Sequence, residues 1–343
     1  MRLHFKIGVA AASLLITGSL FAGNPQRAGS AGAPELLINP WARSSGWGSV
    51  NVASVRGVEA SYLNIAGTAQ TDRTDVAFTN TQWLVGSDIA INAFGFNQKV
   101  GANGVLGANV TAFDYGEWER TTTSNPDGTL GTISPTTVTI GMSYAQRFTE
   151  SILGGVNIKL FSQSSPELSA SALCFDAGVQ YITGAEKQMK FGITLKNVGP
   201  SASYRGDGKS LSLTVPTGGF LRTFEERSAD FELPTTLSIG GSYDFNFVDN
   251  RLTIAGSFMS NSFEKDRFTG GAEYSFKEII MLRAGYTFFN NSVEERTTTV
   301  FTGLTAGLSV QVPMGDSKFI VDYSYSDTNP FDGVHAIGLS FSL

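Results

Sequence analysis

The sequence has very few of the residues from which active sites and metal centres are usually built. Its 343 residues include one cysteine, Cys174, and two histidines, His4 and His335. One cysteine cannot form an intrachain disulfide, and two histidines almost exclude a Cys/His metal site. A Ser–His–acid triad would depend on His335, and no G-x-S-x-G motif is present. We therefore expect neither an enzyme nor a cofactor, and Cys174 is interpreted as a small buried filler.

Charge and long apolar runs are also scarce. Charged residues make up 16% of the chain, below the ~25% typical of soluble domains. The formal net charge is -6 and there is no basic run, which argues against nucleic acid as a partner. After Ala22 no apolar run approaches the ~18 residues of a spanning helix. If the protein lies in a membrane, it must cross it with strands.

The first 22 residues resemble an export signal. Arg2 and Lys6 supply a positive end, residues 7–21 are apolar or small, and Ala22 is a plausible cleavage point. No cysteine follows this segment, so lipid attachment of the usual bacterial lipoprotein type is not expected. We predict a signal peptide over 1–22 and export to the periplasm.

From residue 73 onward, apolar and polar residues alternate with a period of two, which is the signature of strands. Segments such as 138–144, 237–245, 319–325 and 337–343 place their apolar residues on one face. The predicted strands are 74–84, 87–98, 104–117, 135–147, 151–162, 170–182, 188–198, 235–246, 251–260, 267–277, 279–289, 299–312, 317–326 and 334–343. Fourteen is an even number, as expected for a bacterial outer-membrane barrel. The sequence predicts an all-β fold, a transmembrane antiparallel β-barrel over 73–343.

The lengths of the connections support the same interpretation. Alternate connections are short (99–103, 148–150, 183–187, 247–250, 313–316), and those between them are longer (118–134, 163–169, 199–234, 290–298, 327–333). Outer-membrane barrels combine short periplasmic turns with longer external loops. The first hairpin, at 85–86, breaks this rule because it is short although it should face outside.

Charged residues on the inward faces of the strands should line the lumen. They are Lys159, Asp176, Lys190, Lys196, Arg251, Arg267, Glu273, Arg283 and Asp322. Both signs occur, so a self-neutralising polar interior is favoured over a path for a charged substrate. Aromatic residues near strand ends, among them Trp83, Trp118 and Phe301, are expected to form interfacial girdles. The turn that contains Asp327, Asn329 and Asp332 is interpreted as a turn rather than a calcium loop.

The segment 23–72 lacks this alternation and is rich in Gly, Ala, Ser and Asn. Because it precedes the barrel, we expect it on the periplasmic side or folded into the lumen as a plug, a filler that wide barrels commonly carry.

The opening of the predicted mature chain resembles the PorV/PorQ family of the Bacteroidota, relatives of the FadL long-chain fatty-acid barrels. The matching residues are Ala31–Gly32 with Leu36, Leu37 and Ile38, then Ala42–Arg43 with Gly46 and Gly48, and the block Tyr62, Asn64, Ala66 and Gly67. Ile65 stands where the family has proline. Short segments that also resemble the family lie at 138–145, 175–181, 191–200 and 274–288, so the resemblance extends over most of the mature chain.

The resemblance implies a fourteen-stranded FadL-like barrel and a role in type IX secretion. In that system such subunits accompany the large translocon barrel and bind the C-terminal signal domains of secreted cargo. The longest external loop, 199–234, is the candidate partner surface because it mixes apolar and charged residues. The candidate residues are Leu211, Leu213, Val215, Phe220, Leu221, Arg222, Glu225, Glu226 and Arg227. A loop that merely folds over its own barrel is the alternative.

A second function remains open, namely a FadL-type transporter of hydrophobic small molecules. Such a transporter needs a continuous apolar pocket inside the wall, a lateral opening and a mobile 23–72 segment. A secretion subunit needs an apolar surface on its outer loops and can have a closed interior. The charges scattered through the lumen favour the secretion subunit over the transporter. A nonspecific porin ranks last.

Overall fold

The structure is a computed structural model that describes residue 27 and residues 30–122, 124–215, 218–289 and 299–343. The predicted signal peptide, 1–22, and the predicted loop 290–298 lie outside the described residues. Among the described residues, no helix is long and apolar enough to cross a membrane.

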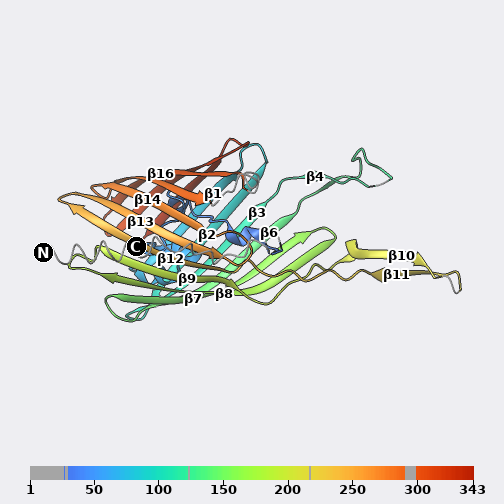
Figure 1. The fold of residues 1–343 in the computed structure, drawn as a ribbon, viewed down its shortest axis with the longest axis horizontal. Helices are drawn as coiled ribbons and strands as arrows, with labels where there is room; N and C mark the ends of the chain where they lie inside the picture. The colour runs from blue at the N-terminus through green and yellow to red at the C-terminus, as the bar shows by residue number, and fades with distance from the viewer. Residues whose placement is uncertain (1–26, 28–29, 123, 216–217, 290–298) are drawn as a thin grey trace.

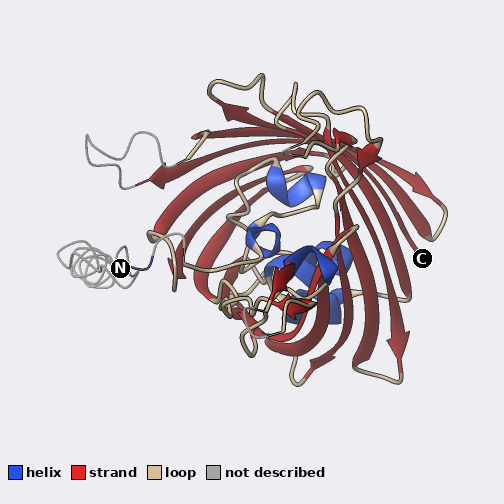
Figure 2. Cartoon of the chain, turned by 90° about the vertical axis from the view of Figure 1, so that its right-hand side faces the viewer, coloured by secondary structure: helices blue, strands red, loops and turns tan. Residues whose placement is uncertain are grey.

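Fourteen antiparallel strands close into a single barrel (Figures 1 and 2). The ring closes where β1 pairs with β18, from Asp75 opposite Ser342 to Gln82 opposite His335. The strands are β1 (Thr74–Trp83), β2 (Ile89–Val100), β3 (Gly104–Asp114), β6 (Thr136–Arg147), β7 (Ile152–Ser165), β8 (Leu168–Thr183), β9 (Met189–Val198), β12 (Thr236–Phe247), β13 (Asn250–Asn261), β14 (Arg267–Phe276), β15 (Ile280–Phe289), β16 (Phe301–Met314), β17 (Ser317–Thr328) and β18 (Val334–Ser342). The fourteen-stranded barrel predicted from the sequence is confirmed.

Alternation along each strand separates an apolar outside from a small or polar inside. On β8, Leu173, Phe175 and Val179 each expose about half of their surface, whereas Cys174 and Gln180 are fully buried. The same outward rows of large apolar side chains recur on the other strands. An apolar outer face of this extent is costly in water and suits contact with acyl chains.

Connections at the end of the barrel where β1 starts are short, and the longest ones lie at the other end, here called the outer end. Four outer connections are also short: residues 84–88, the turn at 166–167, residues 262–266 and residues 329–333. The predicted loop 163–169 is therefore wrong, because β7 and β8 run on until Ser165 pairs with Leu168. The outer loops also form two small hairpins that the sequence analysis missed, β4–β5 (Trp118–Glu119, Thr132–Ile133) and β10–β11 (Ser210–Thr214, Leu221–Glu225).

The segment before β1 lies inside the barrel and is called the plug (residues 31–72; Figure 2). It enters at the outer end, where the Gly32 amide donates to the Glu232 carbonyl at 3.0 Å, and it descends to β1. Its short helical turns are η2 (Pro34–Leu37), α2 (Ala42–Ser45), η3 (Gly57–Glu59), α3 (Ala60–Leu63) and η4 (Ile65–Gln70). Plug side chains such as Trp41, Val50 and Leu63 are almost fully buried.

Glycines on the inward face of the wall make room for the plug. A Cβ at Gly178 would lie 2.1 Å from Asn64 Oδ1, and one at Gly192 would lie 2.6 Å from the Val52 carbonyl oxygen. Contacts below 3.0 Å require a neighbour to move, so these strands can approach the plug only as glycine. Inward-facing wall glycines whose Cβ would lie within 3.2 Å of a plug atom are together called the glycine belt: Gly95, Gly155, Gly178, Gly192, Gly240, Gly271, Gly285, Gly307 and Gly338.

Substitution within the glycine belt should loosen the plug without disturbing strand pairing. We expect Gly192→Ala to weaken plug docking by about 1–3 kcal/mol, since its Cβ meets the Val52 and Ala53 backbone. Acrylamide quenching of Trp41 and Trp47, which are buried in the plug, measures the effect in a Trp83→Phe/Trp118→Phe background. Gly256→Ala is the matched control because a Cβ there meets nothing within 4 Å. Equal quenching in both variants would contradict the role given to the belt.

Candidate functional site

The block Tyr62, Asn64, Ala66 and Gly67, singled out in the sequence, lies at the contact between plug and wall. Asn64 is fully buried, and its Nδ2 donates to the carbonyl oxygens of Val52 (3.0 Å) and Val179 (3.1 Å). Its Oδ1 accepts from the Ala66 amide at 3.2 Å. A Cβ at Gly67 would lie 2.1 Å from the Val55 carbonyl oxygen. Asn64 therefore joins two plug segments to strand β8.

Below the level of the glycine belt, charged side chains form a connected network. Arg283 Nε lies 2.5 Å from Glu273, and Arg251 Nη2 lies 3.0 Å from the same carboxylate. Arg43 of the plug reaches Glu273 at 3.7 Å. Lys190 pairs with Asp244 at 2.6 Å. The structure thus supports the self-neutralising interior, and it ties the plug to β14 electrostatically.

A second group of charges lies on β7, β8 and β9. Lys159 Nζ is 2.8 Å from Asp176 Oδ1, and both side chains are almost fully buried. The ammonium of Lys196 stands 3.7 Å above the ring of Tyr62, a cation–π contact between wall and plug. Tyr62 is thereby held at the side of the plug that faces the outer half of the lumen.

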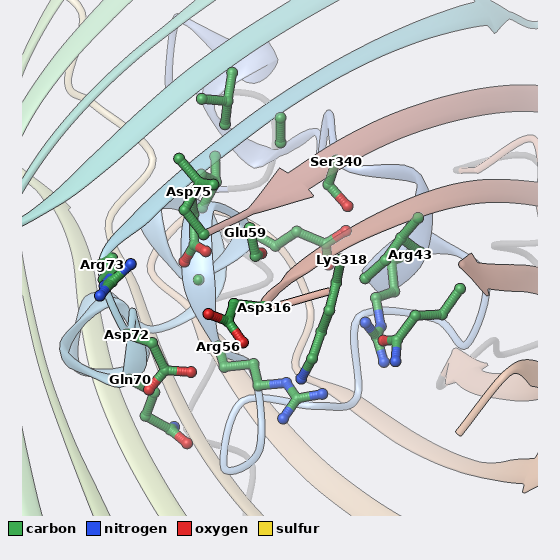
Figure 3. Close-up of a pocket in the computed structure, with 18 residues that line it drawn as sticks. Arg43, Arg56, Glu59, Gln70, Asp72, Arg73, Asp75, Asp316, Lys318 and Ser340 are labelled. Atoms are coloured by element: carbon green, nitrogen blue, oxygen red, sulfur yellow. The ribbon is translucent and has the colours of Figure 1, made fainter. Parts of the chain in front are cut away.

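A polar cavity of about 430 Å³ opens at the inner end of the barrel, beneath the plug (Figure 3). Arg43, Arg56 and Glu59 line it from the plug, and Asp316 and Lys318 line it from the wall. The hydroxyl of Ser44 donates to Glu59. The lining thus carries charges of both signs, and the cavity is called the inner vestibule.

A larger cavity, of about 780 Å³, lies between the plug and strands β12–β18 and β1 in the outer half of the lumen, and is called the outer cavity. Pro34, Leu37, Ile38, Val52 and Leu63 line it from the plug. The wall contributes small hydroxyl residues, the charged residues 264–267 and apolar residues, among them Trp83, Met259, Phe301 and Leu304. A volume in the range of ~300–1,000 Å³ and a partly apolar lining are typical of small-molecule sites. Sequence patterning could not reveal this site, because its wall residues look like ordinary inward-facing positions.

The structure corrects the expectation for three aromatic residues. Trp83 and Phe301 were expected in an interfacial girdle, but both line the outer cavity and contact each other edge to face, with ring centroids 5.6 Å apart. Trp83 continues the inward row of β1, in which Thr79 and Thr81 are buried. Trp118 belongs to the small outer hairpin β4–β5, where it exposes 54% of its surface. Phe245, Phe276 and Phe288 do face outward near strand ends.

The candidate partner residues of the outer loop lie on and beside the β10–β11 hairpin, which projects beyond the barrel (Figure 1). Its pairing sets Leu211 opposite Phe224 and Leu213 opposite Arg222, and the Val215 amide donates to the Phe220 carbonyl. One face is therefore apolar: Leu211, Leu213, Val215, Phe220 and Phe224, with the Arg222 guanidinium 5.1 Å from the Phe220 ring. Leu221 and Glu225 lie on the opposite face, and Glu226 and Arg227 follow the hairpin and are exposed.

Within the described ranges, no group of three or more His, Cys, Asp or Glu side chains is arranged to hold a metal ion. Residues 327–332 were expected to form a turn and not a calcium loop. The Asp327 carboxylate accepts hydrogen bonds from the hydroxyls of Thr302 (2.6 Å) and Tyr325 (3.1 Å). Cys174 is fully buried and packs in a cluster with Phe161, Leu36 and Leu233.

Comparison with known proteins shows the fold but no family. No protein-family model matches the chain, and no curated protein matches it. Among solved structures, the monoaromatic hydrocarbon channel CymD is similar with a TM-score of 0.55 at 14% identity, over 90% of this chain and 98% of that one. The Pseudomonas putida toluene transporter TodX gives 0.55 at 12% identity, over 89% and 98%. A Pseudomonas aeruginosa FadL homologue gives 0.51 at 11% identity, over 88% and 97%. The fold of this chain is thus that of the FadL-like barrels.

Proposed function

We propose that this protein is a channel of the outer membrane that admits hydrophobic or amphipathic small molecules past its plug. The outer cavity carries the proposal, since it gives such a molecule a partly apolar site of about 780 Å³ inside the wall. The similarity of the fold to a toluene transporter and a monoaromatic hydrocarbon channel supports the same class of cargo. Export by the segment 1–22 belongs to this proposal, and the protein itself performs no chemical step.

The wall beside the outer cavity is irregular, which supports a route between the cavity and the lipid. Pairing of β16 with β17 shifts register between Phe301 and Thr305. Leu304, within this bulge, lines the outer cavity and also exposes 53% of its surface. The other register shift among the described strands, at Phe175 and Ala177 of β8, lies outside the cavity lining.

The plug separates the outer cavity from the inner vestibule, so passage to the periplasm requires the plug to shift. Ala42 and Gly338 offer a way to test this, because a Cβ at Gly338 would lie 3.2 Å from Ala42 Cβ. A disulfide needs a Cβ–Cβ separation of about 3.5–4.5 Å, so a small adjustment suffices. Neither residue lines either cavity.

We expect cells that carry the protein to take up toluene faster than cells without it. In a Cys174→Ala background, oxidised Ala42→Cys/Gly338→Cys should reduce this uptake to the level of cells without the protein, because α2 is then fixed to β18. Reduction with dithiothreitol should restore it, and each single cysteine variant serves as the control. Full uptake by the oxidised double variant would show that passage does not require the plug to move. If the wild type takes up none of a panel of hydrophobic probes, the channel proposal is wrong.

Glu59 makes the docking of the plug depend on pH. Burial, and then the nearby Asp322 carboxylate, raise the pKa of Glu59 to about 7, although Arg43 and the Ser44 hydroxyl act in the opposite direction. In a displaced plug, water would return this pKa to its ordinary value of 4.5. A carboxyl whose pKa is raised in the docked state stabilises that state fully below about 4.5, and this contribution is lost as the pH rises through about 7.

We therefore expect the plug to be held more tightly at pH 5 than at pH 8. Acrylamide quenching of Trp41 and Trp47, measured in a Trp83→Phe/Trp118→Phe background, should increase with pH over this interval. Glu59→Gln keeps an acceptor for Ser44 but cannot ionise, so it should show little pH dependence. Identical quenching of the parent protein at both pH values would contradict this role of Glu59.

A second candidate function is supported by the β10–β11 hairpin. A two-stranded ribbon is marginally stable alone in water, and here the ribbon leaves one apolar face uncovered. Such a face suits a protein partner. In this alternative the chain is a PorV/PorQ-like subunit of the type IX secretion system, and its partners are the translocon barrel and the C-terminal signal domains of cargo.

Deletion of residues 205–228 separates the two functions. Because the hairpin stands outside the ring of paired strands, barrel assembly should be retained in both cases, as judged by heat-dependent mobility on electrophoresis. A channel should lose less than about half of its toluene uptake, whereas a secretion subunit should lose surface delivery of its cargo. Normal delivery after the deletion would remove the hairpin from the secretion argument.

A further inference from the structure

The outer cavity has two chemically different sides. The plug presents Pro34, Leu37, Ile38, Val52 and Leu63, all of them apolar. Asn39 and Ser49, polar residues of the same side, already satisfy each other, since Asn39 Nδ2 donates to Ser49 Oγ at 2.8 Å. Ser45 Oγ donates to the Asn39 carbonyl at 3.3 Å, and Tyr62 adds an aromatic ring with a hydroxyl. The plug side is therefore mainly apolar toward a ligand.

The wall side carries a row of hydroxyl groups among apolar residues such as Met259 and Leu304. Ser257 on β13 lies opposite Thr269 on β14, which lies opposite Thr287 on β15, so the three side chains form a row across adjacent strands. The Oγ atoms of Thr269 and Thr287 are 3.1 Å apart. Thr305 and Ser324, on β16 and β17, extend the belt around the cavity. We call these five residues the hydroxyl belt.

Two further wall hydroxyls beside the belt have no hydrogen-bond partner within the described part of the chain. They belong to Thr81 and Ser238, which are 3% and 1% exposed and which line the cavity. A buried hydroxyl without a partner is costly. These two oxygens are themselves covered by protein atoms, so the groups that a ligand can reach are those of the hydroxyl belt. A purely hydrocarbon ligand would offer the hydroxyl belt no hydrogen bond, whereas a ligand with oxygen atoms could bond to it.

The charges at the mouth of the cavity do not favour a charged ligand. The four ionisable residues of the lining there, Glu264 to Arg267, contribute two acids and two bases. Arg267 forms an ion pair with Glu264. A carboxylate or an ammonium would therefore gain little from the net charge of this site.

We propose that the outer cavity binds an uncharged amphipathic molecule, with one apolar face against the plug and hydroxyl, ether or ester oxygens along the other face against the hydroxyl belt. This inference rests on the proposed channel function and names its substrate class. Serine and threonine hydroxyls both donate and accept, so the belt suits an oxygenated terpenoid, a lactone or a small glycoside better than a hydrocarbon. A site built to hydrogen-bond a ligand discriminates against the analogue that lacks the polar groups.

The test uses two probes with the same carbon skeleton, the hydrocarbon limonene and its hydroxylated counterpart α-terpineol. Binding of each radiolabelled probe to the full-length protein in nanodiscs is measured by equilibrium dialysis, with empty nanodiscs subtracted. In Thr269→Val/Thr287→Val the shape of the wall is retained and two hydroxyls are lost. We expect the affinity for α-terpineol to fall roughly 5- to 100-fold, from two lost hydrogen bonds, and the affinity for limonene to stay the same or to rise.

Ser143→Ala is the matched control, because Ser143 is an inward, almost fully buried hydroxyl on β6 that has no partner among the described residues and does not line the cavity. It should change neither affinity. Equal or tighter binding of limonene by the wild type would overturn the inference and leave the channel function standing. An equal loss of affinity for both probes in the double valine variant would also overturn it, since the two hydroxyls would then support the structure of the cavity and not bind the ligand. Binding of neither probe by the wild type would remove the channel function and the inference together.

Discussion

Close contact between the plug and a wall that lacks side chains is the constraint on which the rest of the structure depends. A barrel of fourteen strands encloses more space than inward side chains of ordinary size can fill, so a separate segment must occupy the lumen. Here that segment approaches so closely that Cβ atoms at Gly192 and Gly285 would collide with its backbone, and one at Gly178 would collide with the Asn64 side chain. The wall and the plug therefore specify each other, and the high glycine content has a packing reason.

This contact divides the lumen into two parts of different character. On the inner side, Glu273 forms ion pairs with Arg43 of the plug and with Arg251 and Arg283 of the wall. Such a network fixes orientation, because a displaced plug leaves a buried charge with fewer partners. On the outer side, the cavity is lined mainly by apolar residues and neutral hydroxyls, and the charges of residues 264–267 balance one another. In the proposed function this lining holds a small molecule without a strong electrostatic attraction. A closed inner side and an accommodating outer side are what a gated channel requires.

The sequence predicted the wall well and the interior poorly, and the reason is physical. A strand whose faces meet lipid and lumen repeats every two residues, so β12, expected at 235–246, is found at Thr236–Phe247. The plug carries no such repeat, because its path is set by contacts with strands more than 100 residues away, as between Asn64 and Val179. Trp83 was misplaced for a related reason, since aromatic residues near strand ends occur on both faces. The β10–β11 hairpin was read as a loop, although Leu211, Leu213 and Val215 do alternate.

The hydroxyl belt and the glycine belt belong to one arrangement, since both lie on the inward faces of the same strands. On β15, Gly285 lies against Trp47 of the plug, and two residues further out Thr287 lines the outer cavity. The same step leads from Gly271 to Thr269 on β14. At each pair, the glycine leaves room for the plug. The next inward residue has a small polar side chain, which keeps the space beyond the plug open. Larger apolar residues in these second positions would fill the cavity, so the small hydroxyl residues create the space and, in the proposed function, also select what enters it.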